Sequence, residues 1–158
     1  MVVYVINKHG KPLMPCSPRK ARILLKLGKA KVIRRTPFTI KLLYGSSGYK
    51  QSLTHGVDTG SSEIGSAVVN DKEEVIYMSE ITIRNDITKT MKSRATARRN
   101  RRNRKTRYRK ARWANRKNSI RKDRFSPTMI SKFDSHLKEI NFVKSILPIT
   151  KLILETAN

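Results

Sequence analysis

The sequence predicts an α+β protein, in which a small N-terminal α/β unit and a partial β-sheet precede a long arginine-rich helix. Three observations lead to this fold class. Short aliphatic runs, with only 6% aromatic residues, can build one modest core but not a large one. Turn residues separate these runs over residues 1–85, as expected for strands and hairpins. Residues 86–122 contain neither proline nor glycine, which favours one continuous helix.

Residues 1–50 form the first expected unit. Its one helix, at residues 19–27, has Ser17 and Pro18 as start signals and Gly28 as its stop. The extended segments of this unit are residues 2–6, 12–15, 31–35 and 38–44. A linker rich in glycine and serine at residues 45–48 ends the unit.

Residues 51–85 form the second expected unit, a run of three strands. The first strand ends at Asp58, directly before a glycine turn, and Asn70 and Asp71 make a hairpin turn between the other two. The expected strands are residues 53–58, 64–69 and 74–83.

The two remaining units are residues 86–124, the arginine-rich helix, and residues 125–158. In the last unit, a helix at 128–145 begins after Ser126 and Pro127, and a strand at 149–154 leads to Glu155. The helix is indicated by apolar residues spaced three and four apart, namely Ile130, Phe133, Leu137, Ile140 and Val143.

The charge balance points to a polyanionic partner. The chain has 36 Lys and Arg against 11 Asp and Glu, a formal net charge of +25. Repulsion among so many like charges destabilises a fold, so the excess indicates a polyanionic ligand. No basic helix with a bulky apolar face is present, so no membrane partner is expected. The single cysteine fits a reducing compartment, and the first apolar run is too short for a signal peptide or a membrane span. We therefore expect a cytoplasmic protein.

The arginine-rich segment is the strongest functional signal. Residues 89–124 hold 18 Lys and Arg and one acid, Asp123. On a helix, steps of three and four align one continuous cationic stripe, made of Arg94, Arg98, Arg101, Lys105, Arg109, Arg112 and Arg116. Arg99 and Arg102 lie on the remaining surface of the helix. Because like charges repel, this helix should be only marginally stable until phosphate groups neutralise its cations.

Two aromatic residues lie within the same segment. Tyr108 and Trp113 are candidates for stacking on unpaired bases, or they pin the helix to the rest of the protein. The plainer alternatives for the whole segment are a solvated charged helix and a basic localisation tract. The segment does not distinguish DNA from RNA.

Asp58, within HGVDTGSS at residues 55–62, has several interpretations. The structural one is a hairpin turn capped by the carboxylate. Aspartic proteases share Asp-Thr-Gly-Ser but need a second Asp-Thr-Gly, which here would require a homodimer. An actin-like phosphate loop needs a much longer chain. An RNase-H-like nuclease strand fits locally, with Asp58 and Glu155 as metal-binding carboxylates at the ends of two strands.

Four motifs in order resemble the IscB family, which comprises compact, transposon-encoded, RNA-guided DNA endonucleases of prokaryotic type. PLMP at residues 12–15 resembles the opening motif of the family. GVDTGSS at 56–62 resembles its first RuvC-type segment, and RRNRR at 98–102 the RRXRR signature of its bridge helix. Residues 149–155 resemble the strand that carries the second RuvC-type acid.

This resemblance implies a structured guide RNA on the bridge helix, a DNA target, and Mg²⁺ held by Asp58 and Glu155. The HNH insertion and the third RuvC-type acid have no counterpart, so the chain is expected to be an N-terminal part that is catalytically incomplete alone. His136 and Asp134 are candidate substitute ligands, and we interpret them as ordinary surface residues. Two alternatives remain: an active Mg²⁺-dependent nuclease completed by another polypeptide or by dimerisation, and a non-catalytic, basic RNA-packaging protein.

Overall fold

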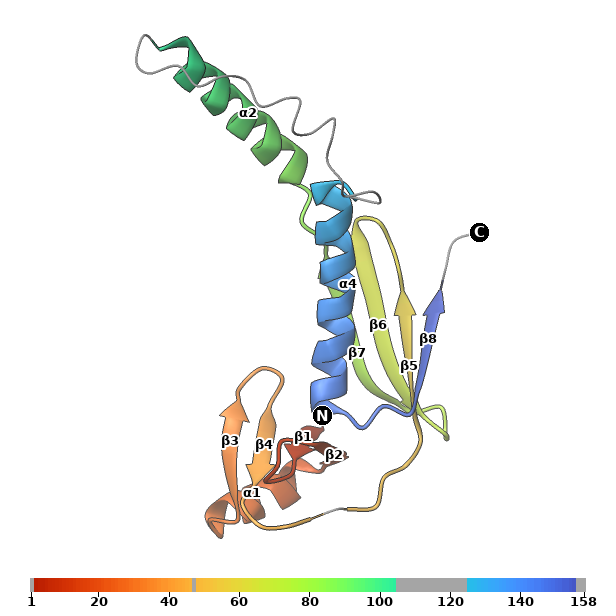
Figure 1. Cartoon of the computed structure of the whole chain (residues 1–158). Coiled ribbons are helices and arrows are strands. Elements are labelled where there is room, and N and C mark those ends of the chain that lie inside the picture. Colours follow the sequence, from red (N-terminus) through yellow and green to blue (C-terminus); the bar gives the residue numbers. More distant parts are fainter. Residues whose placement is uncertain (1, 47, 105–124, 156–158) are drawn as a thin grey trace.

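The computed structural model describes residues 2–46, 48–104 and 125–155, and it confirms the α+β class. The strands of this part of the chain form two four-stranded sheets. The first belongs to the N-terminal unit, and the second carries a helix along one face (Figure 1). A separate helix extends away from both sheets.

The N-terminal unit is one sheet covered by one helix. Its strands, β1 (Val3–Ile6), β2 (Pro12–Cys16), β3 (Ala30–Arg34) and β4 (Thr39–Leu42), lie in the order β2-β1-β4-β3. The helix α1 (Pro18–Lys26) begins where the sequence predicts, since the Ser17 hydroxyl accepts a hydrogen bond from the Lys20 amide. Ala21 of α1 packs into an aliphatic core between the helix and the sheet.

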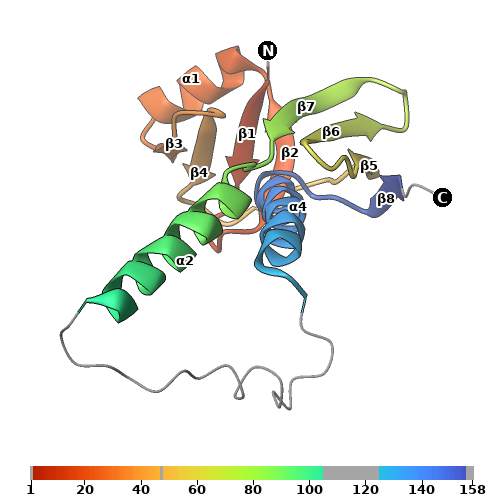
Figure 2. The same ribbon diagram turned by 90° about the horizontal axis from the view of Figure 1, so that it is seen from above.

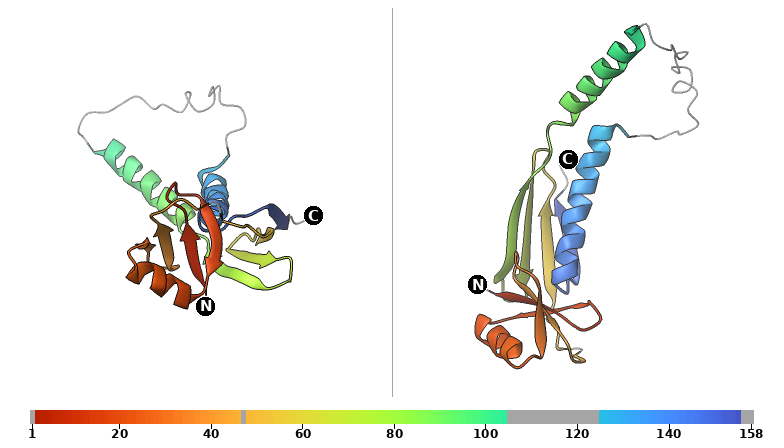
Figure 3. Two further views of the ribbon diagram at one scale, coloured as in Figure 1. Left: turned by 90° about the horizontal axis from the view of Figure 1, so that it is seen from below. Right: turned by 90° about the vertical axis from the view of Figure 1, so that its left-hand side faces the viewer.

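The second sheet combines a meander with one parallel crossover. Its strands, β5 (Leu53–Asp58), β6 (Glu63–Asn70), β7 (Val75–Thr82) and β8 (Lys151–Glu155), lie in the order β7-β6-β5-β8. β5 pairs with β6 antiparallel and with β8 parallel. The helix α4 (Pro127–Ile146) precedes β8 and lies along one face of the sheet (Figures 1 and 3).

Only the C-terminal half of α4 is buried, although apolar residues at helical spacing run along its whole length. Ile140 and Val143 lie in the core, whereas Ile130, Phe133 and Leu137 are 45%, 48% and 56% exposed. The core residues of the sheet nearest to the helix cluster around Ile140, whereas Phe133 of the earlier turns packs edge-to-face on the ring of Phe125. Helical spacing therefore indicated the helix correctly but not how much of it packs.

The two sheets share a core. Tyr4 of β1 packs with Leu53, Val68 and Val143, which come from the second sheet and α4. The Tyr4 hydroxyl donates a hydrogen bond to the Ile76 carbonyl oxygen at 3.2 Å. These contacts join the N-terminal unit to the second sheet, and Figure 2 shows β1 and β2 close to β7 and α4.

The helix α2 (Ile87–Asn103) buries none of its residues and projects beyond the end of the second sheet (Figure 3). The described helix ends at Asn103, and Arg104 has an extended backbone. The predicted continuation of the helix lies outside the described residues. Within the described ranges, no helix is both long and apolar enough to cross a membrane.

Candidate carboxylate site and nucleic-acid interface

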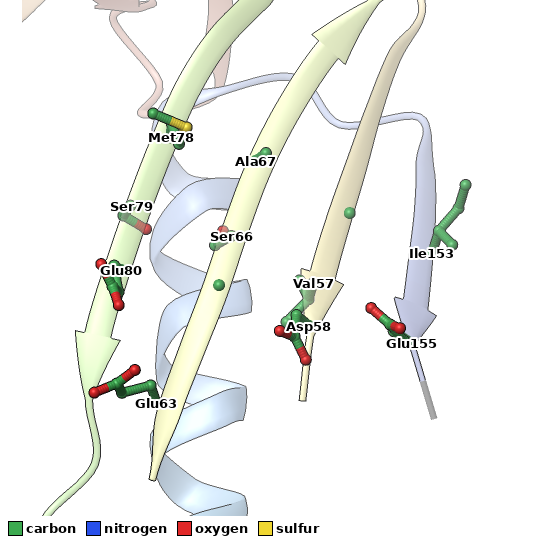
Figure 4. A pocket seen from close by; sticks show the side chains of 12 residues that line it. Val57, Asp58, Glu63, Ser66, Ala67, Met78, Ser79, Glu80, Ile153 and Glu155 are labelled. Carbon is green, nitrogen blue, oxygen red and sulfur yellow. The ribbon is translucent and has the colours of Figure 1, made fainter. Parts of the chain in front are cut away.

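Asp58 and Glu155 lie side by side at the ends of two neighbouring strands. They are the last residues of β5 and β8, and the parallel register pairs them directly. Figure 4 shows both side chains at the same end of the sheet. Since neighbouring strands are about 4.8 Å apart, both carboxylates can reach a common ion. The tertiary structure thus brings together two predicted site residues that are 97 positions apart in the sequence.

The two carboxylates line a hollow of about 710 Å³ on the sheet. Small residues on β5 and β6, Gly56, Gly65 and Ala67, contribute to this hollow. A side chain at position 65 would place its Cβ 3.4 Å from the Cβ of Asp58, so glycine leaves room for the carboxylate. The surface beside Asp58 is open to a ligand because its neighbours are small.

Two further carboxylates line the same hollow. Glu63 of β6 and Glu80 of β7 appear beside it in Figure 4, and the sequence analysis did not single them out. The only available signal was their acidic character within strand segments. His136 and Asp134 do not line the hollow. Across the described ranges, no three His, Cys, Asp or Glu residues are grouped closely enough to hold a metal ion.

The turn after Asp58 ties the two strand ends together. The Thr59 hydroxyl donates a hydrogen bond to the Glu155 carbonyl oxygen at 2.6 Å. At Gly60, a Cβ atom would lie 2.2 Å from the Glu63 carbonyl oxygen, so only glycine fits this turn. Threonine and glycine after Asp58 therefore have local structural roles.

A buried polar layer lies beneath the sheet. His55 is fully buried, and its Nε2 atom is 2.8 Å from the Ser66 hydroxyl. Glu139 of α4 is also buried, and one of its carboxylate oxygens accepts hydrogen bonds from Tyr77 at 2.9 Å and Ser79 at 2.7 Å. The sequence analysis missed this layer, because Glu139 sits between apolar positions of a helix and has the appearance of a surface residue.

Burial shifts the ionisation of this layer. It lowers the pKa of His55, and the negative charge of Glu139 offsets part of that shift. Burial is also the main cause that raises the pKa of Tyr77 to about 12. Both groups are therefore held neutral near pH 7, and Glu139 uses neutral hydroxyl donors to join α4 to β7.

The cationic helix is described only in its first part. The 17 residues of α2 include seven Lys and Arg and no acid. All of the predicted binding residues within it are exposed, namely Arg94, Arg98, Arg99, Arg101 and Arg102. The remaining predicted residues, Lys105, Arg109, Arg112, Arg116, Tyr108 and Trp113, lie outside the described residues.

Charge is strongly divided along the chain. Residues 1–50 carry twelve Lys and Arg and no Asp or Glu. Residues 51–85, which form most of the second sheet, carry six acids and two basic residues. An anionic strand would thus be attracted to the N-terminal unit and to α2, whereas the sheet around Asp58 favours cations.

Comparison with known protein families identifies the chain. No curated protein matches it at a significant level. The RRXRR protein family matches residues 3–158, so the match covers the PLMP, Asp58, arginine-rich and Glu155 segments together. This match confirms the resemblance to the RRXRR domain of IscB-type proteins. The chain therefore belongs to the RRXRR protein family.

Proposed function

We propose that the chain is the guide-RNA-binding, N-terminal part of an IscB-like, RNA-guided DNA endonuclease, and that it does not complete a nuclease site by itself. The observation that carries this proposal is the combination of the RRXRR match with a cationic helix that buries none of its residues. A structured RNA supplies the phosphates that such a helix lacks in the free protein.

The helix α2 suits phosphate binding better than a structural role. Its seven cations face no acidic partner on the helix, and none of its residues is buried. Arginine predominates near its C-terminal end, and the planar guanidinium group contacts phosphate through two hydrogen bonds. The same spacing places Arg94, Arg98 and Arg101 along one face.

Asp58 and Glu155 support a metal-dependent role for the second sheet. Two carboxylates on neighbouring strands are suitable ligands for Mg²⁺, which would activate water for attack on a phosphodiester. Since the described residues offer no third grouped ligand, we propose that another polypeptide supplies it. The expected substrate is the DNA target of the guide RNA.

The guide-RNA proposal is tested by sequencing the RNA that copurifies with the chain. We expect one structured RNA species to be enriched, with the enrichment lost when Arg98, Arg99, Arg101 and Arg102 are replaced by Gln. RNA that mirrors the total cellular pool would instead support a basic RNA-packaging protein and contradict selective guide binding.

The incompleteness of the nuclease site has its own test. The purified chain is incubated with DNA and Mg²⁺, alone and with the copurified RNA, beside the variants Asp58→Ala and Glu155→Ala. We expect no cleavage that depends on either carboxylate. The control variant Asp71→Ala changes an exposed acid in the β6–β7 hairpin. Cleavage by the chain and by Asp71→Ala, but not by Asp58→Ala, would favour the alternative of an active nuclease completed by dimerisation.

A further inference from the structure

A second cavity lies in the N-terminal unit and shares no lining residue with the hollow at Asp58. It has a volume of about 690 Å³, which is within the usual range for small-ligand sites. It is bounded by α1, the start of β1, the loop between β3 and β4, and Ile76 of β7. Figure 2 shows β1 between α1 and β7, three of the elements whose residues line the cavity.

The walls of this cavity are mainly apolar, and one of them is aromatic. Val2 and Phe38 both line it, and they are 40% and 37% exposed. Tyr4 also lines the cavity and is held by the hydrogen bond of its hydroxyl to the Ile76 carbonyl. Phe38 thus offers a partly exposed aromatic side chain beside an ordered apolar wall.

Two arginines complete the lining. Arg22 comes from α1 and Arg35 from the loop after β3, and both are exposed. No acidic residue lines the cavity, and none occurs anywhere in residues 1–50. Neither guanidinium makes an ion pair with a described residue. Both charges are therefore available to an anionic ligand.

We propose that this cavity binds an unpaired nucleotide of an RNA strand. The base stacks against Phe38 inside the cavity, and the adjacent phosphates contact Arg22 and Arg35. An apolar cavity with an aromatic wall matches the face of a base, and the cationic rim matches its phosphates. An acidic peptide without aromatic residues would satisfy the arginines but would place no flat apolar group against the ring.

This site extends the proposed function, because it lies outside the arginine-rich helix and recognises a different feature of RNA. The helix offers cations to the phosphates of a structured RNA, whereas the cavity requires a base that is free of a partner. Base-paired RNA keeps its bases stacked and cannot insert one at low cost.

The test compares two hexamers with the same backbone charge, oligouridylate and its abasic counterpart. Affinities are measured by fluorescence anisotropy for the full chain and for Phe38→Leu, which keeps an apolar side chain but removes the ring. Stacking on an aromatic residue contributes about 5-fold or more to affinity for each base. We expect oligouridylate to bind more tightly than the abasic strand, and Phe38→Leu to remove about 5-fold of that preference. Phe38→Trp should restore it.

A charge-matched pair of variants tests the rim. Replacing Arg22 and Arg35 by Gln should weaken oligouridylate binding at least 5-fold more than replacing Lys26 and Lys31, two exposed cations of the same unit that do not line the cavity. Unfolding temperatures of all variants establish that each is folded.

Three results would overturn the proposal. The first is an equal loss for both hexamers in Phe38→Leu, and the second is an equal loss in the two charge-matched variants. The third is a polyglutamate peptide that competes with oligouridylate in the wild type but not in the Arg22 and Arg35 variant, since that would identify a peptide site. Failure of the cavity is distinguishable from failure of the helix, because helix variants should weaken both hexamers alike.

Discussion

The arginine cluster of α2 permits a quantitative prediction about salt. Arg98, Arg99, Arg101 and Arg102 are all exposed, so their replacement by Gln should leave the free energy of unfolding within about 0.5 kcal/mol of the wild type. Each phosphate contact that is lost flattens the slope of log K against log salt by about 0.7–0.9. If all four arginines contact phosphate, the slope changes by roughly 3 units.

A change of this size is large in practice. Between 50 and 200 mM salt, 3 units of slope correspond to a roughly 60-fold difference in how far affinity falls. The assay is a titration of the copurified RNA by fluorescence anisotropy at four salt concentrations. Both the wild type and the variant are measured, so that the slopes and not single affinities are compared.

A charge-matched control separates local contact from overall charge. Four basic residues of the last unit are replaced by Gln in one variant, namely Lys132, Lys138, Lys144 and Lys151. This control loses the same formal charge as the α2 variant. If both variants flatten the slope equally, RNA binding reflects net charge alone and the assignment of α2 as the binding helix is wrong.

Three further predictions concern the second sheet. Glu139→Ala leaves the hydroxyls of Tyr77 and Ser79 without their acceptor, so it should lower the free energy of unfolding by about 2–4 kcal/mol in urea titrations. The control Lys138→Ala, at the exposed neighbouring residue, should change this free energy by about 0.5 kcal/mol at most. Burial lowers the pKa of His55, so the stability that the neutral imidazole contributes to the fold is complete above pH 6.5 and is lost as the pH falls below that value. His55→Gln should therefore reduce the loss of stability in acid, whereas the exposed His9→Gln should not. Gly60→Ala should cost about 1–3 kcal/mol by thermal unfolding, whereas Gly45→Ala, whose added Cβ meets no atom closer than 4.0 Å, should be tolerated. A Gly60→Ala protein as stable as the wild type would contradict the tight turn.

Local sequence signals predicted most of the elements. The start of α1 at Ser17 and Pro18 and the start of α4 at Ser126 and Pro127 are confirmed, because each serine side chain accepts a hydrogen bond from the backbone three residues later. The stretch at residues 12–15 was expected only to be extended, and the structure pairs it with β1 as the edge strand β2. Strand pairing depends on a distant partner and so could not be deduced from this stretch alone.

Burial was the weakest part of the prediction. Apolar spacing indicated the helix α4 but not which of its turns are buried, and the sheet covers only the turns around Ile140 and Val143. The burial of Glu139 could not be predicted from the sequence either. A carboxylate is costly to bury unless donors meet it, and those donors, Tyr77 and Ser79, lie about sixty residues away on β7.

By itself, the sequence determined the fold class, the family and the cationic segment, because these depend on local periodicity, ordered motifs and composition. The tertiary structure decided which carboxylates meet. Asp58 and Glu155 become neighbours only through the parallel register of β5 and β8, and Glu63 and Glu80 join the same hollow through the meander. It also decided that Arg22, Arg35 and Phe38 surround one cavity. Such arrangements depend on contacts between distant segments, and no local pattern in the chain encodes them.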